Sequence, residues 1–277
     1  MKSSEPKAYD IGDLLRLMER LRDPETGCPW DLKQTYQSIA PFTLEECLEL
    51  IDALEQNDLA HVEEELGDLL FQVIFYSQMG KEEGRFDFAS VVSGITAKLL
   101  RRHPHVFKDG ELEGVITDRA SIDTIKTNWE AEKAAERAAR AQQSAMDDVP
   151  TTLSALARAQ KLQKRASSLG YDFSSVNQVL NSLNSELGEL AEAREIHGQA
   201  EIENELGDVL FTVVNLARHL KVDAEAALRQ SNRRFEQRVR RAESAAINEG
   251  SRLQDESPER LEERWSAVKT EENGCDL

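Results

Sequence analysis

Apolar residues recur at intervals of three and four along most of the chain, and few stretches alternate in the way of β-strands. Intervals of three and four place side chains on one face of an α-helix. Only seven prolines interrupt the pattern. The sequence therefore predicts an all-α protein.

The pattern of apolar and acidic positions occurs twice along the chain. The segment "EECLEL" at Glu45 aligns with "SELGEL" at Ser185, a shift of 140 residues. The same shift aligns "EELGDLLFQV" at Glu64 with "NELGDVLFTV" at Asn204, and it becomes 136 beyond an unmatched segment, Glu82–Arg85. Repeated positions in constant order indicate an internal duplication.

The duplication predicts two tandem helical bundle domains, and a chain of 277 residues is long enough for two. Between the copies lies "AEKAAERAARAQQSAMDDVP", an Ala-rich segment that ends at Asp147, Asp148 and Pro150. This composition is typical of a helix end followed by a linker. We expect an N-terminal domain with its linker helix over residues 1–147 and a C-terminal domain over 148–277.

Each copy carries two acidic pairs with i, i+3 spacing, which share a helix face. In the first copy the pairs are Glu46 with Glu49 and Glu65 with Asp68. Their midpoint is Asn57, a residue suited to a turn. A helical hairpin folded there would bring the four carboxylates to one height.

The second copy repeats this arrangement with Glu186, Glu189, Glu205 and Asp208, and its midpoint is His197. We therefore expect four converging carboxylates in each domain. The second copy has Ser185 where the first has Glu45, so one nearby carboxylate is missing.

The second acidic helix of the first copy is apolar around most of its circumference. Glu65, Asp68 and Gln72 form its polar stripe, and no Lys or Arg occurs between Leu54 and Gly80. Ionised carboxylates in apolar surroundings need a compensating cation. Oxygen ligands favour a hard divalent ion, so the sequence predicts Mg²⁺, with Mn²⁺ as a possible substitute.

Two glycines in the acidic helices, Gly67 and Gly207, predict a close approach to the backbone, because glycine is unfavourable inside a helix. Basic pairs at i, i+4 and two tryptophans are candidates for phosphate and base contacts, although such residues also serve as solvated charges and core. The candidate substrate-binding residues are Arg234, Arg238, Trp265, Lys98, Arg102, Trp129 and Asn215.

Composition narrows the classes of partner. A formal net charge of −18 argues against a nucleic-acid polymer or an anionic membrane as partner. Three cysteines without a CxxC pair argue against a disulfide framework or a zinc site. No apolar run is long enough for a membrane span, so we expect a soluble, cytoplasmic protein.

The segments "EECLE" and "EELGD" resemble the EExxE and ExxD motifs of the MazG family of all-α nucleoside triphosphate pyrophosphohydrolases. Two tandem copies, with "GCPWD" at Gly27, "EEGRFDF" at Glu83 and "RRHPHVF" at Arg101, resemble the two-domain bacterial members. The resemblance extends from about Leu14 to Lys269.

The resemblance implies bundle domains that form a homodimer, dependence on Mg²⁺, and hydrolysis of nucleoside triphosphates to monophosphate and pyrophosphate. Glu45 is a further catalytic candidate, which either helps to orient the attacking water or is peripheral. The resemblance also implies that eight carboxylates bind metal. These are Glu46, Glu49, Glu65, Asp68, Glu186, Glu189, Glu205 and Asp208, of which the last four are also the expected catalytic residues.

The predicted function is a broad-specificity house-cleaning enzyme that cleaves the α–β phosphoanhydride of ribo- and deoxyribonucleoside triphosphates. Carboxylate-bound Mg²⁺ would orient the triphosphate and lower the pKa of a bound water. A different class remains open, namely a catalytically silent helical module that binds nucleotides and regulates a partner. Within the enzymes, a hydrolase restricted to damaged nucleotides or a phosphoribosyl-ATP pyrophosphohydrolase is the alternative.

Overall fold

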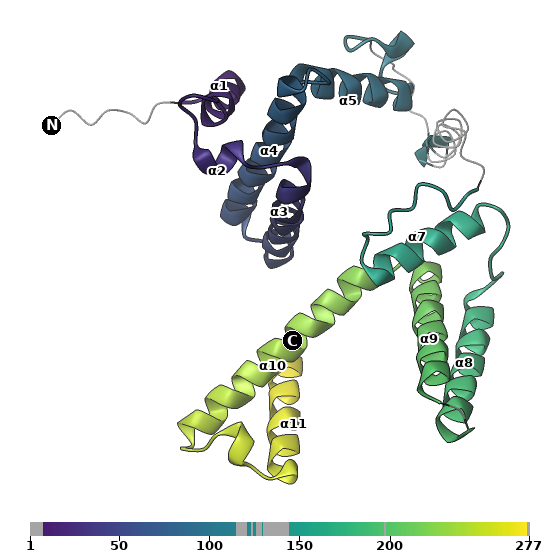
Figure 1. Ribbon diagram of the computed structural model, residues 1–277. Coiled ribbons are helices and arrows are strands. Elements are labelled where there is room, and N and C mark those ends of the chain that lie inside the picture. Colours follow the sequence, from purple (N-terminus) through teal and green to yellow (C-terminus); the bar gives the residue numbers. More distant parts are fainter. Residues whose placement is uncertain are drawn as a thin grey trace. The chain divides into compact units, whose positions relative to one another are not determined.

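Figure 1 shows a chain of helices. The computed structural model describes residues 8–114, 121–122, 124–125, 129, 144–196 and 198–275, with side chains described up to residue 270. Within these ranges every regular element is a helix and no strand occurs, which confirms the predicted fold class. None of the described helices is long and apolar enough to cross a membrane.

The chain divides into two compact units, Met1–Glu136 and Arg137–Leu277. This agrees with the tandem domains that the duplication predicts. Residues 130–143, on both sides of the division, lie outside the described part, so the boundary expected after residue 147 stays a prediction.

The helices of the first unit are α1 (Ile11–Leu21), α2 (Pro29–Leu32), α3 (Tyr36–Gln56), α4 (Leu59–Glu82), α5 (Phe88–Arg102) and the 3₁₀ turn η1 (Lys108–Gly110). Those of the second unit are α7 (Ala155–Ser167), α8 (Val176–Ile196), α9 (Gln199–His219), α10 (Ala224–Asn248), η2 (Leu253–Asp255) and α11 (Pro258–Cys275).

The boundaries of the helices repeat along with the sequence. Helices α3 and α8 both contain 21 residues and begin 140 positions apart, and α9 begins 140 positions after α4. Helix α10 begins 136 positions after α5, as the shorter shift requires. In each unit the first two of these helices pack side by side as an antiparallel hairpin (Figure 1).

Asn57 makes the turn of the first hairpin, as predicted. It ends α3 with the left-handed backbone conformation (φ 56°) that Asn tolerates better than most residues. Asp58 then caps α4 by accepting a hydrogen bond from the backbone N–H of His61. In the second hairpin, the expected turn residue His197 lies outside the described residues, between the end of α8 and the start of α9.

The core of the first unit lies where α1 and α3 meet α4. It contains Met18, Ile39, Ile74, Phe75 and Met79, each at most 4% exposed.

A buried cation borders this core. The Arg22 guanidinium lies 5.3 Å from the centroid of the Phe75 ring. It donates to the Glu82 carboxylate at 2.7 Å and to the Asp31 carbonyl at 2.6 Å. These bonds satisfy the charge and fix the segment that follows α1 against the end of α4.

A loop of the second unit is fastened to α9 by one carboxylate. Asp172 accepts hydrogen bonds from both Nη atoms of Arg218, at 3.0 Å for Nη1, and its Oδ1 lies 3.1 Å from His219 Nε2. The bonds from Arg218 hold the pKa of Asp172 well below its ordinary value of 3.8.

Replacing Asp172 by Asn is therefore expected to destabilise the second unit by about 1.5–3 kcal/mol at neutral pH, the range for hydrogen bonds to charged groups. Because the folded-state pKa is lowered, this stability is present above the unfolded pKa near 3.8 and is lost as the pH falls towards the folded value. Urea unfolding followed by circular dichroism, with the exposed Asp255→Asn as control, measures both effects. Equal stability of wild type and Asp172→Asn at pH 7 would contradict the expectation.

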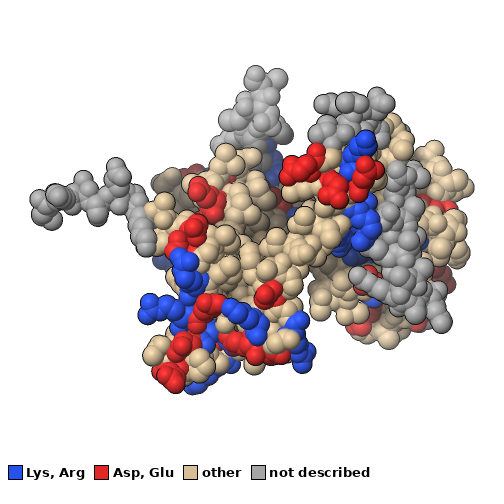
Figure 2. All heavy atoms as spheres, turned by 90° about the horizontal axis from the view of Figure 1, so that it is seen from above, with Lys and Arg blue, Asp and Glu red and all other residues tan. Residues whose placement is uncertain are grey.

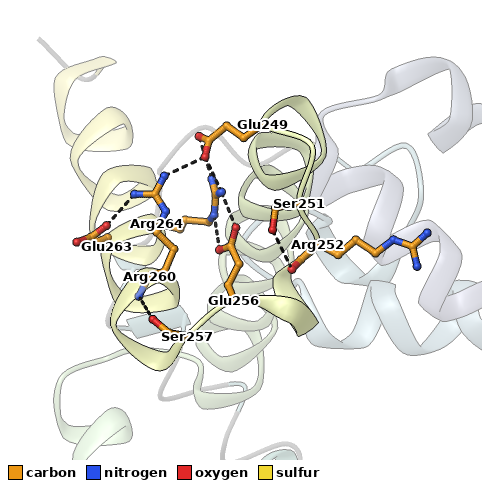
Figure 3. Close-up of polar contacts among 8 residues, drawn as sticks. All are labelled: Glu249, Ser251, Arg252, Glu256, Ser257, Arg260, Glu263 and Arg264. Atoms are coloured by element: carbon orange, nitrogen blue, oxygen red, sulfur yellow. Dashed lines mark hydrogen bonds and ion pairs between the residues drawn. The ribbon is translucent and has the colours of Figure 1, made fainter.

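Ion pairs connect helix α11 with the end of α10 and with the segment between the two helices (Figure 3). Arg264 donates to Glu256 at 2.6 Å and to Glu249 at 2.8 Å, and Arg260 also donates to Glu249, at 2.9 Å. Bidentate and shared ion pairs of this kind fix geometry as well as adding energy. Trp265 follows Arg264 directly along α11.

Candidate metal and nucleotide site

The α3–α4 hairpin brings together acids from both of its helices. Carboxylate oxygens of Glu46, Glu49 and Glu65 all lie within 4.8 Å of one another. Asp68, the fourth predicted ligand, is not in that set, but it lines one cavity with Glu46. The predicted convergence is therefore seen for three carboxylates, with the fourth at their edge. Glu45 lies on α3 and is exposed.

The second hairpin gathers a similar set. Oxygens of Glu186, Glu205 and Asp208 lie within 4.8 Å of one another. Glu189 lies outside this set and accepts a hydrogen bond of 3.0 Å from Ser185 Oγ. Ser185, which stands where the first copy has Glu45, thus contacts the predicted ligand Glu189.

Glu65 is the most deeply buried of these acids, at 5% exposed. Its Oε1 lies 2.7 Å from His61 Nε2, whereas its Oε2 is buried without a hydrogen-bond partner. A buried carboxylate oxygen without a partner costs free energy unless a cation or donor reaches it. The acids grouped with it, Glu46 and Glu49, offer carboxylate oxygens, which suit a hard divalent cation.

The pKa of one glutamate in each cluster is shifted in the same direction by similar causes. Burial, followed by the charges of Asp68 and Glu49, raises the pKa of Glu46 above its ordinary value. Burial, followed by Glu189 and Asp208, does the same for Glu186. Each cluster therefore holds mutually repelling carboxylates, and both sets of residues fit a bound metal ion.

The structure assembles part of the predicted substrate-binding set on α10 and α11. The Trp265 ring lies 5.5 Å from that of Phe235, with the Arg238 guanidinium 5.7 Å and the Lys269 ammonium 5.9 Å from its centroid. Arg234 is exposed one turn before Arg238. These residues lie on the α10–α11 pair, whereas the acids lie on the α8–α9 hairpin.

The remaining candidates are Lys98, Arg102, Trp129 and Asn215. Lys98 and Arg102 are half-buried on α5, one turn apart, and Trp129 is 44% exposed. Asn215 is 9% exposed beside the second hairpin's core, where its Oδ1 accepts a 2.7 Å hydrogen bond from Arg218. Its carbonyl is thus already engaged within the unit.

The expected close approach to Gly67 and Gly207 is not made by any described segment of the chain, and it stays a prediction. A Cβ placed on Gly67 or on Gly207 would have no atom within 4 Å, apart from the adjoining residues and the backbone of its own helix. Both glycines face open space because they lie on the outer side of their helices, where no other described segment of the chain packs.

Sequence reasoning missed His61, Trp30 and Phe42 near the first acidic cluster. His61 was identifiable, since it lies one turn before Glu65 on the same helix. Trp30 and Phe42 line the cavity that contains Glu46 and Asp68, and their rings meet edge to face at 6.0 Å. Their proximity to the acids depends on how the segment before α3 folds, which periodicity does not reveal.

Charges of both signs are interspersed on the face in Figure 2. Among the described residues visible there, Lys and Arg form no continuous surface.

The MazG nucleotide pyrophosphohydrolase domain matches the chain twice, at residues 34–107 and 174–241. The two matches contain the acidic hairpins α3–α4 and α8–α9. The known domain and the internal duplication therefore coincide.

Relatives align over nearly the whole chain. The nucleoside triphosphate pyrophosphohydrolase of Escherichia coli K12 is 47% identical over 264 residues, covering 95% of this chain and 98% of that protein. The nucleoside triphosphate pyrophosphohydrolase/pyrophosphatase MazG of Thermotoga maritima is 38% identical over 257 residues, covering 93% and 94%. A crystal structure of a mazG-related protein from Thermotoga maritima matches 45% of this chain and 99% of its own, with 26% identity and a TM-score of 0.37. The repeated domain and the full-length relatives show that the chain belongs to the MazG family of nucleotide pyrophosphohydrolases.

Proposed function

We propose that the protein is a Mg²⁺-dependent nucleoside triphosphate pyrophosphohydrolase that cleaves the α–β phosphoanhydride of ribo- and deoxyribonucleotides with broad base specificity. Its role would be house-cleaning of the cytoplasmic nucleotide pool. The observation that carries the proposal is the pair of carboxylate clusters, above all Glu65 with a buried oxygen that lacks a partner. The names of the full-length relatives support the same reaction.

In this reaction a water oxygen bonds to the α-phosphorus while the bond to the β-phosphate bridging oxygen breaks, so pyrophosphate leaves. Mg²⁺, when bound, would offset phosphate charge and lower the pKa of water. Glu46, Glu49 and Glu65 would hold it in the first unit, and Glu186, Glu205 and Asp208 in the second.

Positioning groups support these roles. His61 orients Glu65, and Ser185 orients Glu189. Such contacts fix a carboxylate before the substrate arrives. Arg234 and Arg238 would bind phosphate oxygens, and Trp265 would offer a ring face to the base.

The proposal includes a homodimer. Each acidic hairpin exposes an apolar stripe at i, i+4, i+7 spacing on its second helix, and the two stripes correspond at a shift of 140. They consist of Leu66, Leu70 and Val73, exposed at 51%, 38% and 38%, and Leu206, Leu210 and Val213, at 46%, 52% and 43%. Repeated apolar stripes on exposed faces are typical of association surfaces.

We expect light scattering to give the mass of a dimer at micromolar concentration. Leu210→Asp should shift the mass towards that of a monomer, because an ionised carboxylate would be buried in the interface. Leu169→Asp, at a position that is 68% exposed beyond the end of α7, is the matched control. A monomeric wild-type protein would refute the dimer.

The test of the activity is a product assay over the eight common ribo- and deoxyribonucleoside triphosphates with Mg²⁺. Pyrophosphate rather than orthophosphate is expected, which identifies the bond that breaks. Stacking on a Trp face tolerates every base. We therefore expect kcat/KM values within about tenfold, which corresponds to about 1.4 kcal/mol in transition-state binding. A thousandfold preference for one triphosphate would contradict broad specificity, and absence of pyrophosphate would contradict the reaction.

A further inference from the structure

A buried ion pair joins Arg264 of α11 to Glu256, which lies just before that helix. Both side chains are only 6% exposed, and the guanidinium donates from Nε and Nη2 to the two carboxylate oxygens, each at 2.6 Å. Its Nη1 and Nη2 atoms also donate to Glu249, which directly follows the last turn of α10. Figure 3 shows the guanidinium between the two carboxylates. One side chain thus joins α10, the connecting segment and α11.

This ion pair contributes geometry more than net stability. Removing two charges from water offsets much of their mutual attraction. Two parallel hydrogen bonds between a guanidinium and a carboxylate, however, permit little change in their relative orientation. Within the described part of α11, the other buried side chain is Val268, one turn after Arg264. Because α11 buries so little apolar surface, its placement on α10 depends strongly on the contacts of Arg264.

The candidate contacts for base and phosphate are divided between these two helices. Arg238 belongs to α10, whereas Trp265 and Lys269 belong to α11. The two cations lie 5.7 Å and 5.9 Å from the centroid of the Trp265 ring. A displacement of α11 along α10 would separate Trp265 from Arg238. The group therefore exists in one arrangement of the two helices.

Resting on the proposed function, we propose that Arg264 and Glu256 are positioning residues of the second nucleotide site, and that their ion pair holds α11 where Trp265 can engage the base. Neither residue touches the substrate in this role. The first copy has no equivalent pair, because Asn128 and Ala120 stand at these positions at a shift of 136. This means of positioning therefore belongs to the second unit.

The kinetic test uses the full-length chain with Glu65→Gln, so that turnover reports the second cluster. Arg264→Met should raise KM for ATP about tenfold and leave kcat within about twofold, because it displaces binding groups without altering the metal ligands. Partial unfolding would instead lower the apparent kcat at unchanged KM. Arg264→Lys keeps the charge but not the two parallel bonds, so an intermediate KM is expected. Glu256→Gln should also raise KM, and Glu262→Gln, at an exposed position of α11, is its matched control.

A second measurement follows Trp265 itself. With Trp30→Phe and Trp129→Phe, Trp265 is the remaining tryptophan of the chain. Arg264→Met should then shift its emission to longer wavelength and increase its quenching by acrylamide, because the ring leaves Phe235 and meets water. Circular dichroism establishes that each variant keeps its helices. If Arg264→Met does not fold, Arg264→Lys decides the question.

The possible failures are distinguishable. If the wild type releases pyrophosphate and the folded Arg264→Met and Glu256→Gln variants keep its KM, the positioning role is refuted while the proposed function stands. Unchanged Trp265 fluorescence in folded Arg264→Met overturns the positioning role as well, independently of any activity. A wild type that releases no pyrophosphate refutes the proposed function and, with it, the substrate of this site, even where the Trp265 emission shifts.

Discussion

Asp208→Asn is expected to lower the Mg²⁺-dependent kcat/KM on the order of a hundredfold or more, about 2.7 kcal/mol, in a chain whose first cluster already carries Glu65→Gln. The change replaces a charged oxygen ligand with a neutral one at almost constant shape. Asp208 shares its cluster with Glu186 and Glu205, so it would contact the metal directly. The same loss is expected for Glu205→Gln.

The reciprocal experiment measures how much the first domain contributes to the activity. Glu65→Gln, or Asp68→Asn, is introduced into a chain that carries Asp208→Asn. The matched controls are Glu63→Gln and Glu203→Gln, exposed positions two residues before Glu65 and Glu205. If the combined cluster variants retain full turnover, the carboxylates are not the catalytic site.

A second readout does not depend on activity. A ligand that binds only the folded state raises stability in proportion to RT ln(1 + [L]/Kd). Mg²⁺ should therefore raise the thermal midpoint of the wild type more than that of the cluster variants. Without Mg²⁺, Asp208→Asn should be no less stable than wild type, because it removes one of the charges that repel Glu186. Loss of stability under those conditions would indicate a structural role instead.

Much of the fold follows from the repetition of the sequence. The shifts of 140 and 136 residues reappear as the starting points of α8, α9 and α10 relative to α3, α4 and α5. The first hairpin turns at Asn57, its midpoint, and carboxylates of α3 and α4 lie close together, as expected. These features depend on local periodicity and on turn chemistry, which a sequence displays directly.

The parts that sequence reasoning missed depend on contacts between distant segments. Gln72 was assigned to a polar stripe, yet it is 7% exposed and lines a cavity together with Trp30 and Phe42. The spacing of residues also did not reveal that the Trp265 ring lies beside Phe235 and two cations. The apolar circumference of α4 predicted burial on most sides, whereas Leu66 is 51% exposed in the single chain.

Phe75→Ala is expected to destabilise the first unit by about 3–5 kcal/mol, the range for removing a buried aromatic ring. The Phe75 side chain is 1% exposed within the core of Met18, Ile39 and Ile74. It also lies under the Arg22 guanidinium, so its removal takes away a cation–π contact. Since the free energy of unfolding of a domain is only about 5–15 kcal/mol, this loss is a large share of it.

The matched control is Leu59→Ala at the start of the same helix, where the leucine is 77% exposed and the expected change is within about 0.5 kcal/mol. The corresponding position of the second unit holds Asn215, which is 9% exposed and accepts a hydrogen bond from Arg218. Urea unfolding of both variants, followed by circular dichroism, gives the comparison. If Phe75→Ala loses no more stability than Leu59→Ala, the hydrophobic cluster around Phe75 is not what holds α1 and α3 to α4.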